Sequence, residues 1–166
     1  MAIWISIPVL GSLVIIQSVI ASRIALLQGT ADIVMLAIIA WALQKRVMTA
    51  WHWAIIGGLL VSFVSGLPFG IPIISYSIAV GIALALRQRV WQVPMLAMFT
   101  TTLLGTICTQ IIVSVTLSLT GISMPIFYVL SSITLPSILL NLLLAIPFYA
   151  LLGELASWLY PEELEI

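Results

Sequence analysis

Long apolar runs, separated by only a few polar residues, constrain this chain more than any other feature of its sequence. The first run extends from Ile3 to Ser22, and others follow with short breaks as far as Leu159. Only 6% of the 166 residues are charged, whereas a soluble domain averages about 25%. Five basic and five acidic side chains cannot cover the surface of a soluble fold of this size. We therefore expect most of the surface to face hydrocarbon.

The breaks between the runs predict about six transmembrane helices, since a crossing needs roughly 20 mostly apolar residues. Glycine, proline and basic residues mark the helix ends. The predicted helices span about 3–22, 31–44, 49–65, 71–86, 94–119 and 136–159. The helix over 31–44 is short: either the bilayer is locally thin, or residues 24–30 complete the crossing as a turn covered by protein. Residues 124–134 are expected to form an apolar connection that includes a short interfacial helix.

The basic residues predict the orientation, because Lys and Arg favour the cytoplasmic side. With six spans and the N-terminus inside, Lys45, Arg46, Arg87 and Arg89 are cytoplasmic, and only Arg23 is outside. Tryptophans favour the headgroup layer, and all six fall at the ends of the helices predicted to be cytoplasmic. These are Trp4, Trp41, Trp51, Trp53, Trp91 and Trp158.

The sequence thus predicts an all-α polytopic membrane protein with both termini cytoplasmic. Residues 1–166 are expected to form a single integral membrane domain, because six helices leave too few residues for a second domain. The first 22 residues lack a basic n-region, so the helix over 3–22 is expected to be retained and not cleaved as a signal peptide. The net charge of zero gives no indication of nucleic-acid binding.

Small residues recur at every fourth position along the helix predicted over 49–65. This small-residue ladder comprises Ala50, Ala54, Gly58, Ser62 and Gly66. In lipid, such a face lets two helix backbones approach closely. It can pack within the chain, or it can form a groove for the transmembrane helix of a partner, and one long ladder can serve both. Ala54, Gly58 and Ser62 are the first candidates for partner binding.

Polar residues recur with the same spacing along the helix predicted over 94–119. This polar stripe comprises Thr102, Thr106, Gln110, Ser114 and Ser118. Gln110 lies near the middle of the span, where an unsatisfied amide is costly, so the stripe is expected to face protein or a cavity. Ser and Thr can bond to carbonyls of their own helix while Gln110 pairs with a neighbouring helix. Alternatively, the stripe contacts a ligand or a partner.

Other polar residues within the runs are few: Gln17, Asp32, Asn141 and Glu154. Asp32 is the only acid outside the C-terminal region. It is expected to cap the helix over 31–44 at the outer surface, where a negative group favours a helix N-terminus. Glu154 lies close enough to the cytoplasmic end to extend its carboxylate to water.

Catalysis has little support in the sequence. The one histidine, His52, lies between two tryptophans and is expected at the interface, and the one cysteine, Cys108, is expected to be a packing residue. No two acids are placed to share a proton within the membrane, and neither a Cys/His cluster nor a glycine-rich phosphate loop is found. We therefore predict no catalytic, cofactor-binding or metal-binding residues and no enzymatic activity.

Four motifs occur in an order that resembles the MreD family, the membrane component of the bacterial rod-shape system. Gln17-Ser18 resembles its first-helix signature, and residues 29–36 resemble "G-x-P-D-L-L-L", with Ala31 where proline is usual. Gly57-Gly58-Leu59-Leu60 followed by Ser65-Gly66-Leu67-Pro68-Phe69-Gly70 resembles "G-F-x-x-G-L-x-x-D-x-x-S-G-x-P-L-G", although Ser62 occupies the region of the aspartate. Leu135-Pro136-Ser137-Ile138-Leu139-Leu140-Asn141 resembles the closing "P-S-x-L-L-N".

The resemblance implies a non-enzymatic multi-pass protein of the bacterial cytoplasmic (inner) membrane. MreD-like proteins work with MreC, a bitopic periplasmic protein, with the RodA glycosyltransferase and a class B penicillin-binding protein, and with cytoplasmic MreB filaments. The candidate residues for contact with such partners, beside membrane lipids, are Ala54, Gly58, Ser62, Gln110, Asp32 and Asn141.

The alternative function comes from a second likeness. In size and six-helix plan the family also resembles the substrate-binding S-components of energy-coupling-factor vitamin transporters. A chain of that kind holds a small solute near the outer ends of its helices. A vitamin site needs convergent polar groups, and the predicted outer side offers few of them. These are Arg23, Gln28, Asp32 and Tyr76.

Overall fold

The computed structural model describes residues 2–21, 26–89, 93–122 and 124–160. In this part of the chain the regular elements are all helical, as predicted. They are α1 (Ala2–Ala21), α2 (Ile33–Ala42), α3 (Ala50–Val64), α4 (Ile71–Arg89), α5 (Pro94–Leu119), α6 (Ile126–Tyr128), the π-helix η1 (Val129–Thr134) and α7 (Leu135–Leu159). The element bounds agree with all six predicted helices to within a few residues; only the segment before the last helix differs.

Three helical segments in the described ranges are long and apolar enough to cross a membrane. They are Ile71–Gln88, Pro94–Leu119 and Ile126–Leu159. Three further apolar helices, Ile3–Val19, Ile33–Ala42 and Ala50–Val64, are shorter. These lengths are compatible with a membrane protein. The number of six crossings and the orientation of the chain remain predictions.

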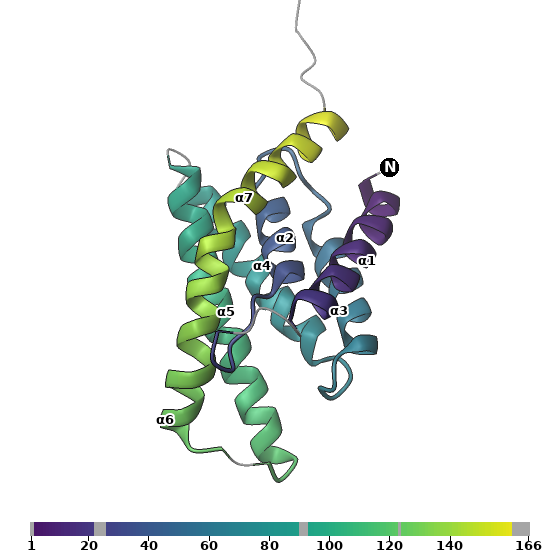
Figure 1. Cartoon of the computed structure of the whole chain (residues 1–166). Helices are drawn as coiled ribbons and strands as arrows, with labels where there is room; N and C mark the ends of the chain where they lie inside the picture. The colour runs from purple at the N-terminus through teal and green to yellow at the C-terminus, as the bar shows by residue number, and fades with distance from the viewer. Residues whose placement is uncertain (1, 22–25, 90–92, 123, 161–166) are drawn as a thin grey trace, which may run out of the picture.

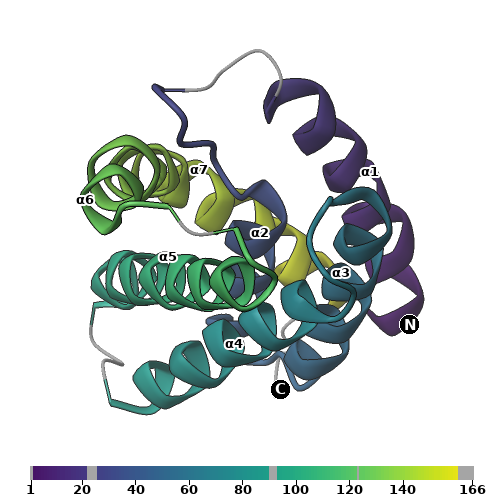
Figure 2. The same ribbon diagram turned by 90° about the horizontal axis from the view of Figure 1, so that it is seen from below.

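Helix α2 lies at the centre of the bundle, and α1, α3, α4, α5 and α7 surround it (Figure 2). All ten of its residues are buried, and none is more than 4% exposed. Its sequence, IVMLAIIAWA, is apolar on every side, which is typical of a helix that is enclosed all round. The short second helix is therefore the core of the molecule.

The chain reaches α2 through a turn that other parts of the protein cover. Leu26 and Gly29 exchange backbone hydrogen bonds of 3.0 Å, and the Gln28 N–H donates to the Ser132 carbonyl at 3.0 Å. A Cβ at Gly29 would lie 2.7 Å from the Ile133 carbonyl oxygen in η1 and equally close to Pro136 Cβ and Ser137 N in the first turn of α7. Of the two alternatives for the short crossing, the described residues 26–30 thus support the protein-covered turn.

The last helical segment begins earlier than predicted. The sequence predicts a connection over 124–134 and a helix from about 136, but α6 and η1 run directly into α7, so the segment spans Ile126–Leu159. Proline has no N–H to donate and is tolerated in the first turn of a helix. A π-helical register before Pro136 accommodates it. A second proline, Pro147, lies inside α7, and this helix changes direction along its length (Figure 1).

The predicted cytoplasmic ends do lie together. The N-terminus of α1, the C-terminal end of α2 and the C-terminal end of α7 share one end of the bundle (Figure 1). Lys45 and Arg46 follow α2 at this end, and Arg87 lies in the last turns of α4. Arg23 lies outside the described residues, so its position on the opposite side stays a prediction.

The prediction that all six tryptophans lie in the headgroup layer is wrong for two of them. Trp41 and Trp53 are 0% exposed, and their rings stack with centroids 4.3 Å apart. Because Trp41 belongs to the enclosed α2, its ring fills the core, and its Nε1–H donates to Thr49 Oγ1 at 3.2 Å. Three tryptophans are exposed as the prediction requires, and one lies outside the described residues. The exposed ones are Trp4, Trp51 and Trp158, and the last is Trp91.

Candidate functional site

Side chains from four helices meet around the N-terminal end of α2. They are Gln17 from α1, Tyr76 from α4, Thr106 from α5 and Asn141 from α7, and they surround the N-cap residue Asp32. We call this set the α2 N-terminal network. The sequence places these residues far apart, and the structure brings them together because α2 touches all four helices.

Asp32 is the N-cap of α2, as predicted. Its Oδ1 accepts the Met35 N–H at 3.0 Å and the Tyr76 hydroxyl at 2.9 Å, and Oδ2 also lies 3.0 Å from that hydroxyl. The Gln17 side chain also hydrogen-bonds to the carboxylate. Its position at the outer surface stays a prediction, and the structure shows that Asp32 is partly buried and that its partner Tyr76 is only 2% exposed.

Asn141 and Gln17 satisfy backbone groups that a buried helix start leaves without partners. The Asp32 N–H donates to Asn141 Oδ1 at 2.8 Å, and the Val34 N–H donates to Gln17 Oε1 at 2.9 Å. The Asn141 amide then donates to Thr106 Oγ1 at 2.9 Å. In hydrocarbon each unsatisfied group costs several kcal/mol, so this network holds α2 in place.

The role of the α2 N-terminal network is therefore to stabilise the fold. Asn141 is 1% exposed and uses its amide inside the bundle, so its predicted contact with a partner is not available on the folded chain. Asp32 likewise directs its carboxylate to partners within the chain. Among the described residues no three His, Cys, Asp or Glu side chains gather in a way that could hold a metal ion.

The small-residue ladder packs inside the chain. Ala54 is 0% exposed and Ser62 is 7% exposed. A Cβ on Gly58 would lie 2.5 Å from the Cα atom of Ile73 in α4, so α3 and α4 touch backbone to backbone at this point. The Ser62 hydroxyl donates to the Gly58 carbonyl at 2.7 Å. Of the two interpretations, internal packing is the one observed, and a partner helix would have to displace α4 to reach these residues.

The polar stripe on α5 divides into two halves. Thr102 and Thr106 are buried within the bundle, and the Thr106 hydroxyl donates to the Thr102 carbonyl at 2.8 Å. Ser118 follows the predicted pattern and donates to the Ser114 carbonyl of its own helix at 2.9 Å. Gln110, between the halves, forms no side-chain hydrogen bond within the part of the chain that the structure describes, so its predicted pairing with a neighbouring helix is not observed.

Gln110 lines a groove between the C-terminal half of α5 and the α6–η1 segment, where the two splay apart (Figure 1). We call it the α5–η1 groove. It comprises cavities of about 90 Å³ and 360 Å³ that share four lining residues, Ser114, Ser118, Met124 and Val129. Most of the other lining side chains are apolar, among them Val113, Leu117, Ile126 and Ile133.

Arg87, which in the sequence indicates only the orientation, has a structural role. The Arg87 Nη1 donates to the carbonyls of Ala42, Gln44 and Val47 at 3.1, 2.9 and 3.0 Å. The Ala42 carbonyl belongs to the last turn of α2, where a cation is favourable, and the other two carbonyls lie in the segment that follows the helix. The sequence shows only that one arginine lies near the end of an apolar helix. That position does not reveal which carbonyls its side chain reaches.

The fold defines a class, an all-helical chain in which three segments can cross a membrane, but no particular family. No protein-family model matches the chain, and no curated protein or solved structure matches it either.

Proposed function

We propose that this chain is a non-enzymatic scaffold of the bacterial cell-shape and peptidoglycan-elongation machinery in the cytoplasmic membrane. In this role it binds the transmembrane helix of an MreC-like bitopic partner. It thereby takes part in an assembly with a RodA-type glycosyltransferase, a class B penicillin-binding protein and cytoplasmic MreB filaments. The multi-pass topology, with both termini cytoplasmic, belongs to the same proposal.

The motifs that resemble the MreD family support the proposal through their positions. Gly29 and the Pro136-Ser137 pair, from two different motifs, are in contact. Asp32 and Asn141, from the same two motifs, share a hydrogen bond of 2.8 Å. Such pairs are a more specific sign of a shared fold than apolar runs are. Their members are distant in sequence but fit each other closely, so substituting one of them alone creates a clash or an unsatisfied group.

The observation that carries the docking site is the Gln110 amide. It lies on a membrane-length helix, lines the α5–η1 groove and lacks a hydrogen-bond partner among the described residues. Amide side chains join helices in membranes by hydrogen bonds across the interface. A partner helix in the groove would satisfy Gln110 and cover apolar side chains on both walls. We therefore place the partner helix there and not on the α3 ladder.

The test compares two variants of α5 for co-purification with a co-expressed MreC-like protein. Gln110→Leu removes the amide and keeps a side chain of similar size, so we expect at least an approximately fivefold loss of bound partner, as a lost interhelical hydrogen bond of about 1 kcal/mol implies. Thr116→Val is the matched control. Its hydroxyl bonds only to the Ile112 carbonyl of its own helix, at 2.8 Å, so partner binding should be unchanged.

The stability of the chain alone makes this test specific. Because the Gln110 amide forms no internal hydrogen bond within the described ranges, Gln110→Leu should leave the thermal unfolding midpoint in detergent unchanged or slightly raised. Wild-type levels of bound partner in this variant would exclude the α5–η1 groove as the docking site. Loss of partner in the Thr116→Val control as well would show that the effect is not specific to the amide.

The vitamin-transporter alternative is tested on the same purified chain. The α5–η1 groove is the described cavity nearest the predicted outer ends of the helices, and its polar side chains are Gln110, Ser114 and Ser118. A vitamin bound there would raise the unfolding midpoint in a thermal-shift screen. A saturable shift with one vitamin, abolished by Gln110→Leu, would favour the S-component over the scaffold.

A further inference from the structure

A tight turn of residues 26–29 precedes α2 and lies against the π-helix η1. We call it the 26–29 turn. Leu26 and Gly29 close it by exchanging backbone hydrogen bonds of 3.0 Å. Leu27 has a φ of 57°, a left-handed conformation that is unfavourable for a residue with a Cβ atom. The Leu27 side chain is 70% exposed, so its own packing does not offset this strain. The turn depends on its contacts with η1.

The hydrogen bonds of η1 explain why the turn contacts it. In an α-helix the Ser132 carbonyl would accept the N–H of residue 136, but Pro136 has no N–H. The Gln28 N–H of the turn donates to this carbonyl instead, at 3.0 Å. The end of η1 has the π pattern, since the Leu135 N–H donates to the Leu130 carbonyl five residues before it. The turn thus supplies the donor that the proline lacks.

Gly29 sets how closely the turn approaches η1. A Cβ at this position would lie 2.7 Å from the Ile133 carbonyl oxygen and from Pro136 Cβ, so this approach requires glycine. Ile133 also lines the α5–η1 groove, together with Val129 at the start of η1. The 26–29 turn therefore contacts the same short helix that forms one wall of the groove.

A change of η1 to the α-helical register would displace this wall. Each residue of an α-helix turns the chain by about 100° and advances it by about 1.5 Å. A shift of one residue would therefore rotate α6 and the start of η1 by that angle relative to α7. A side chain on the surface of the rotated segment would move by about 8 Å. Ile126 and Val129, which line the groove, would leave it.

We propose that the 26–29 turn is a register switch that holds η1 in its π form and thereby maintains the α5–η1 groove. The part of this inference that concerns a partner rests on the proposed function, because the groove is the proposed docking site. The conformation of Leu27 favours release of the turn, whereas a helix bound in the groove favours the π form, since a ligand stabilises the state that it binds. The switch couples the start of the central helix α2 to the docking surface.

The test measures the distance between α5 and α6 in the full chain in detergent, without a partner. Spin labels are attached at Ile111→Cys and Phe127→Cys, two exposed positions that do not line the groove. Cys108→Ala removes the native thiol. Pro136→Ala then restores the missing N–H and keeps the Cβ that faces Gly29. We expect a second population of distances, shifted by several ångströms from that of the parent chain.

A second variant acts on the other side of the contact. Gly29→Ala places a Cβ against the Ile133 carbonyl and displaces the turn, so it should give the same second population as Pro136→Ala. Two matched controls should keep the parent distance. They are Gly11→Ala, whose Cβ would meet nothing within 4 Å, and Pro147→Ala, further along α7. The parent distance in both Pro136→Ala and Gly29→Ala would overturn the proposal.

Hydrogen exchange of the wild-type chain keeps the proposal testable if these variants fail to fold. The Gln28 amide and the Leu135 amide should become exposed in one opening event, because the turn is released when the register changes. Their protection factors should therefore agree. Protection factors that differ by more than about tenfold would overturn a shared opening.

Partner binding separates the register switch from the proposed function. Pro136→Ala should reduce the amount of co-purified partner in proportion to the population that lacks the groove. If the distances shift as expected but the wild-type chain binds no partner, the switch is confirmed and the scaffold function is wrong. Equal partner binding by the wild type and Pro136→Ala, with the distances shifted, would overturn the coupling between the turn and the docking site.

Discussion

At the N-terminal end of α2, three side chains each satisfy one backbone N–H group, and they come from α1, from α7 and from the cap residue itself. They are Gln17, Asn141 and Asp32, at 2.9, 2.8 and 3.0 Å. Near the C-terminal end, a single nitrogen of Arg87 donates to three carbonyls, that of Ala42 in the last turn of α2 and those of Gln44 and Val47 in the segment that follows. The first end distributes its hydrogen bonds over side chains from several helices. Near the second end, three bonds are concentrated on the Arg87 side chain, which joins the last turn of α2 to the segment after it, while Gln44 caps the Ala40 carbonyl.

The difference follows from the chemistry of the two helix ends. The free N–H groups at a helix start point in separate directions, and each needs its own acceptor. Carbonyls at a helix end carry partial negative charge and can converge on one cation. A fully enclosed helix of ten residues leaves a large share of its backbone groups at its two ends. Its position therefore depends on these side chains as well as on packing.

The largest expected effect is the loss of the concentrated end. Arg87→Met keeps most of the side-chain volume but leaves three carbonyls without their donor, so we expect a loss of roughly 3 kcal/mol in the free energy of unfolding. Titration with SDS in mixed micelles measures this change. Arg87→Lys is the control: one Arg87 nitrogen makes all three contacts, and an ammonium group has three donors. Equal losses in the two variants would show that charge-assisted capping is not the cause.

A smaller loss is expected at the distributed end. Asn141→Leu leaves the Asp32 N–H without its acceptor inside the bundle and removes the bond donated to Thr106 Oγ1, which keeps only its bond to the Thr102 carbonyl. This loss should cost about 2 kcal/mol. Adding Gln17→Leu removes the acceptor of the Val34 N–H and should bring the total close to that of Arg87→Met. A double variant no less stable than Asn141→Leu alone would contradict the view that separate side chains share this end.

The sequence predicts the helices well because their ends carry strong local signals. Glycine, proline and basic residues interrupt the apolar runs, and the positions of all six predicted helices follow from them. The exception is the segment before Pro136, where proline is read as the start of a helix. The π-helical turn of η1 carries the chain through it. That register depends on tertiary packing, since Gly29 and Gln28 contact this segment from the other end of the sequence.

Burial is harder to predict in an apolar chain, because the hydrophobic pattern that separates core from surface in water is absent. Trp41 and Trp53 have the same local sequence character as the exposed Trp51 and Trp158, yet they stack in the core. The α3 ladder has a helix interface, as its spacing predicts, but the spacing does not reveal whether the neighbour belongs to the same chain. Here the neighbour is α4, at Ile73.

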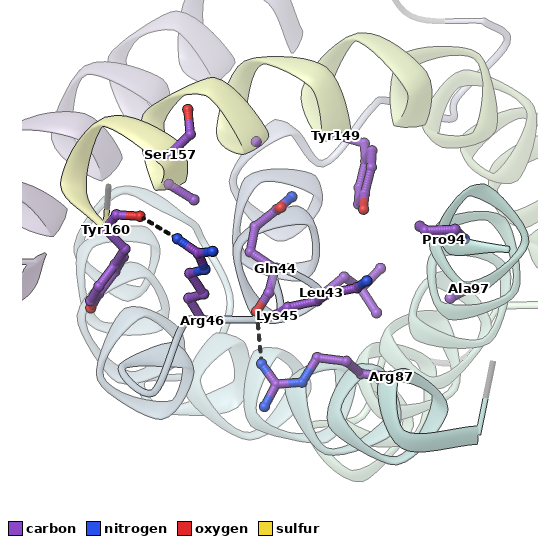
Figure 3. Close-up of a pocket in the computed structure, with 12 residues that line it drawn as sticks. Leu43, Gln44, Lys45, Arg46, Arg87, Pro94, Ala97, Tyr149, Ser157 and Tyr160 are labelled. Carbon is purple, nitrogen blue, oxygen red and sulfur yellow. Dashed lines mark hydrogen bonds between the residues drawn. The ribbon is translucent and has the colours of Figure 1, made fainter. Parts of the chain in front are cut away.

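The polar residues show the same limit. Asp32 is correctly predicted as a helix cap, since that role is local, while its contact with Tyr76 joins residues 44 positions apart. Asn141 contacts Asp32 across 109 positions. A single sequence gives the depth of such a side chain in the membrane but not its partner. The cavity of about 320 Å³ that Arg87, Arg46 and Tyr149 line (Figure 3) likewise forms only because these residues meet in the folded chain.

The smallest expected effect refines the distributed end further. Tyr76→Phe removes the hydroxyl that contacts both Asp32 oxygens, but Asp32 keeps the Met35 N–H and Gln17 as partners. The aromatic ring still fills its buried position, so the free energy of unfolding should fall by only about 1 kcal/mol. Ser12→Ala is a suitable control in the SDS titration, because this exposed hydroxyl donates only to Val9 of its own helix. A loss with Tyr76→Phe as large as that with Asn141→Leu would mean that the N-terminal end of α2 depends chiefly on the orientation of the Asp32 carboxylate. Both ends of α2 would then depend mainly on one side chain each, Asp32 at the start and Arg87 at the end, and the proposed difference between them would be wrong.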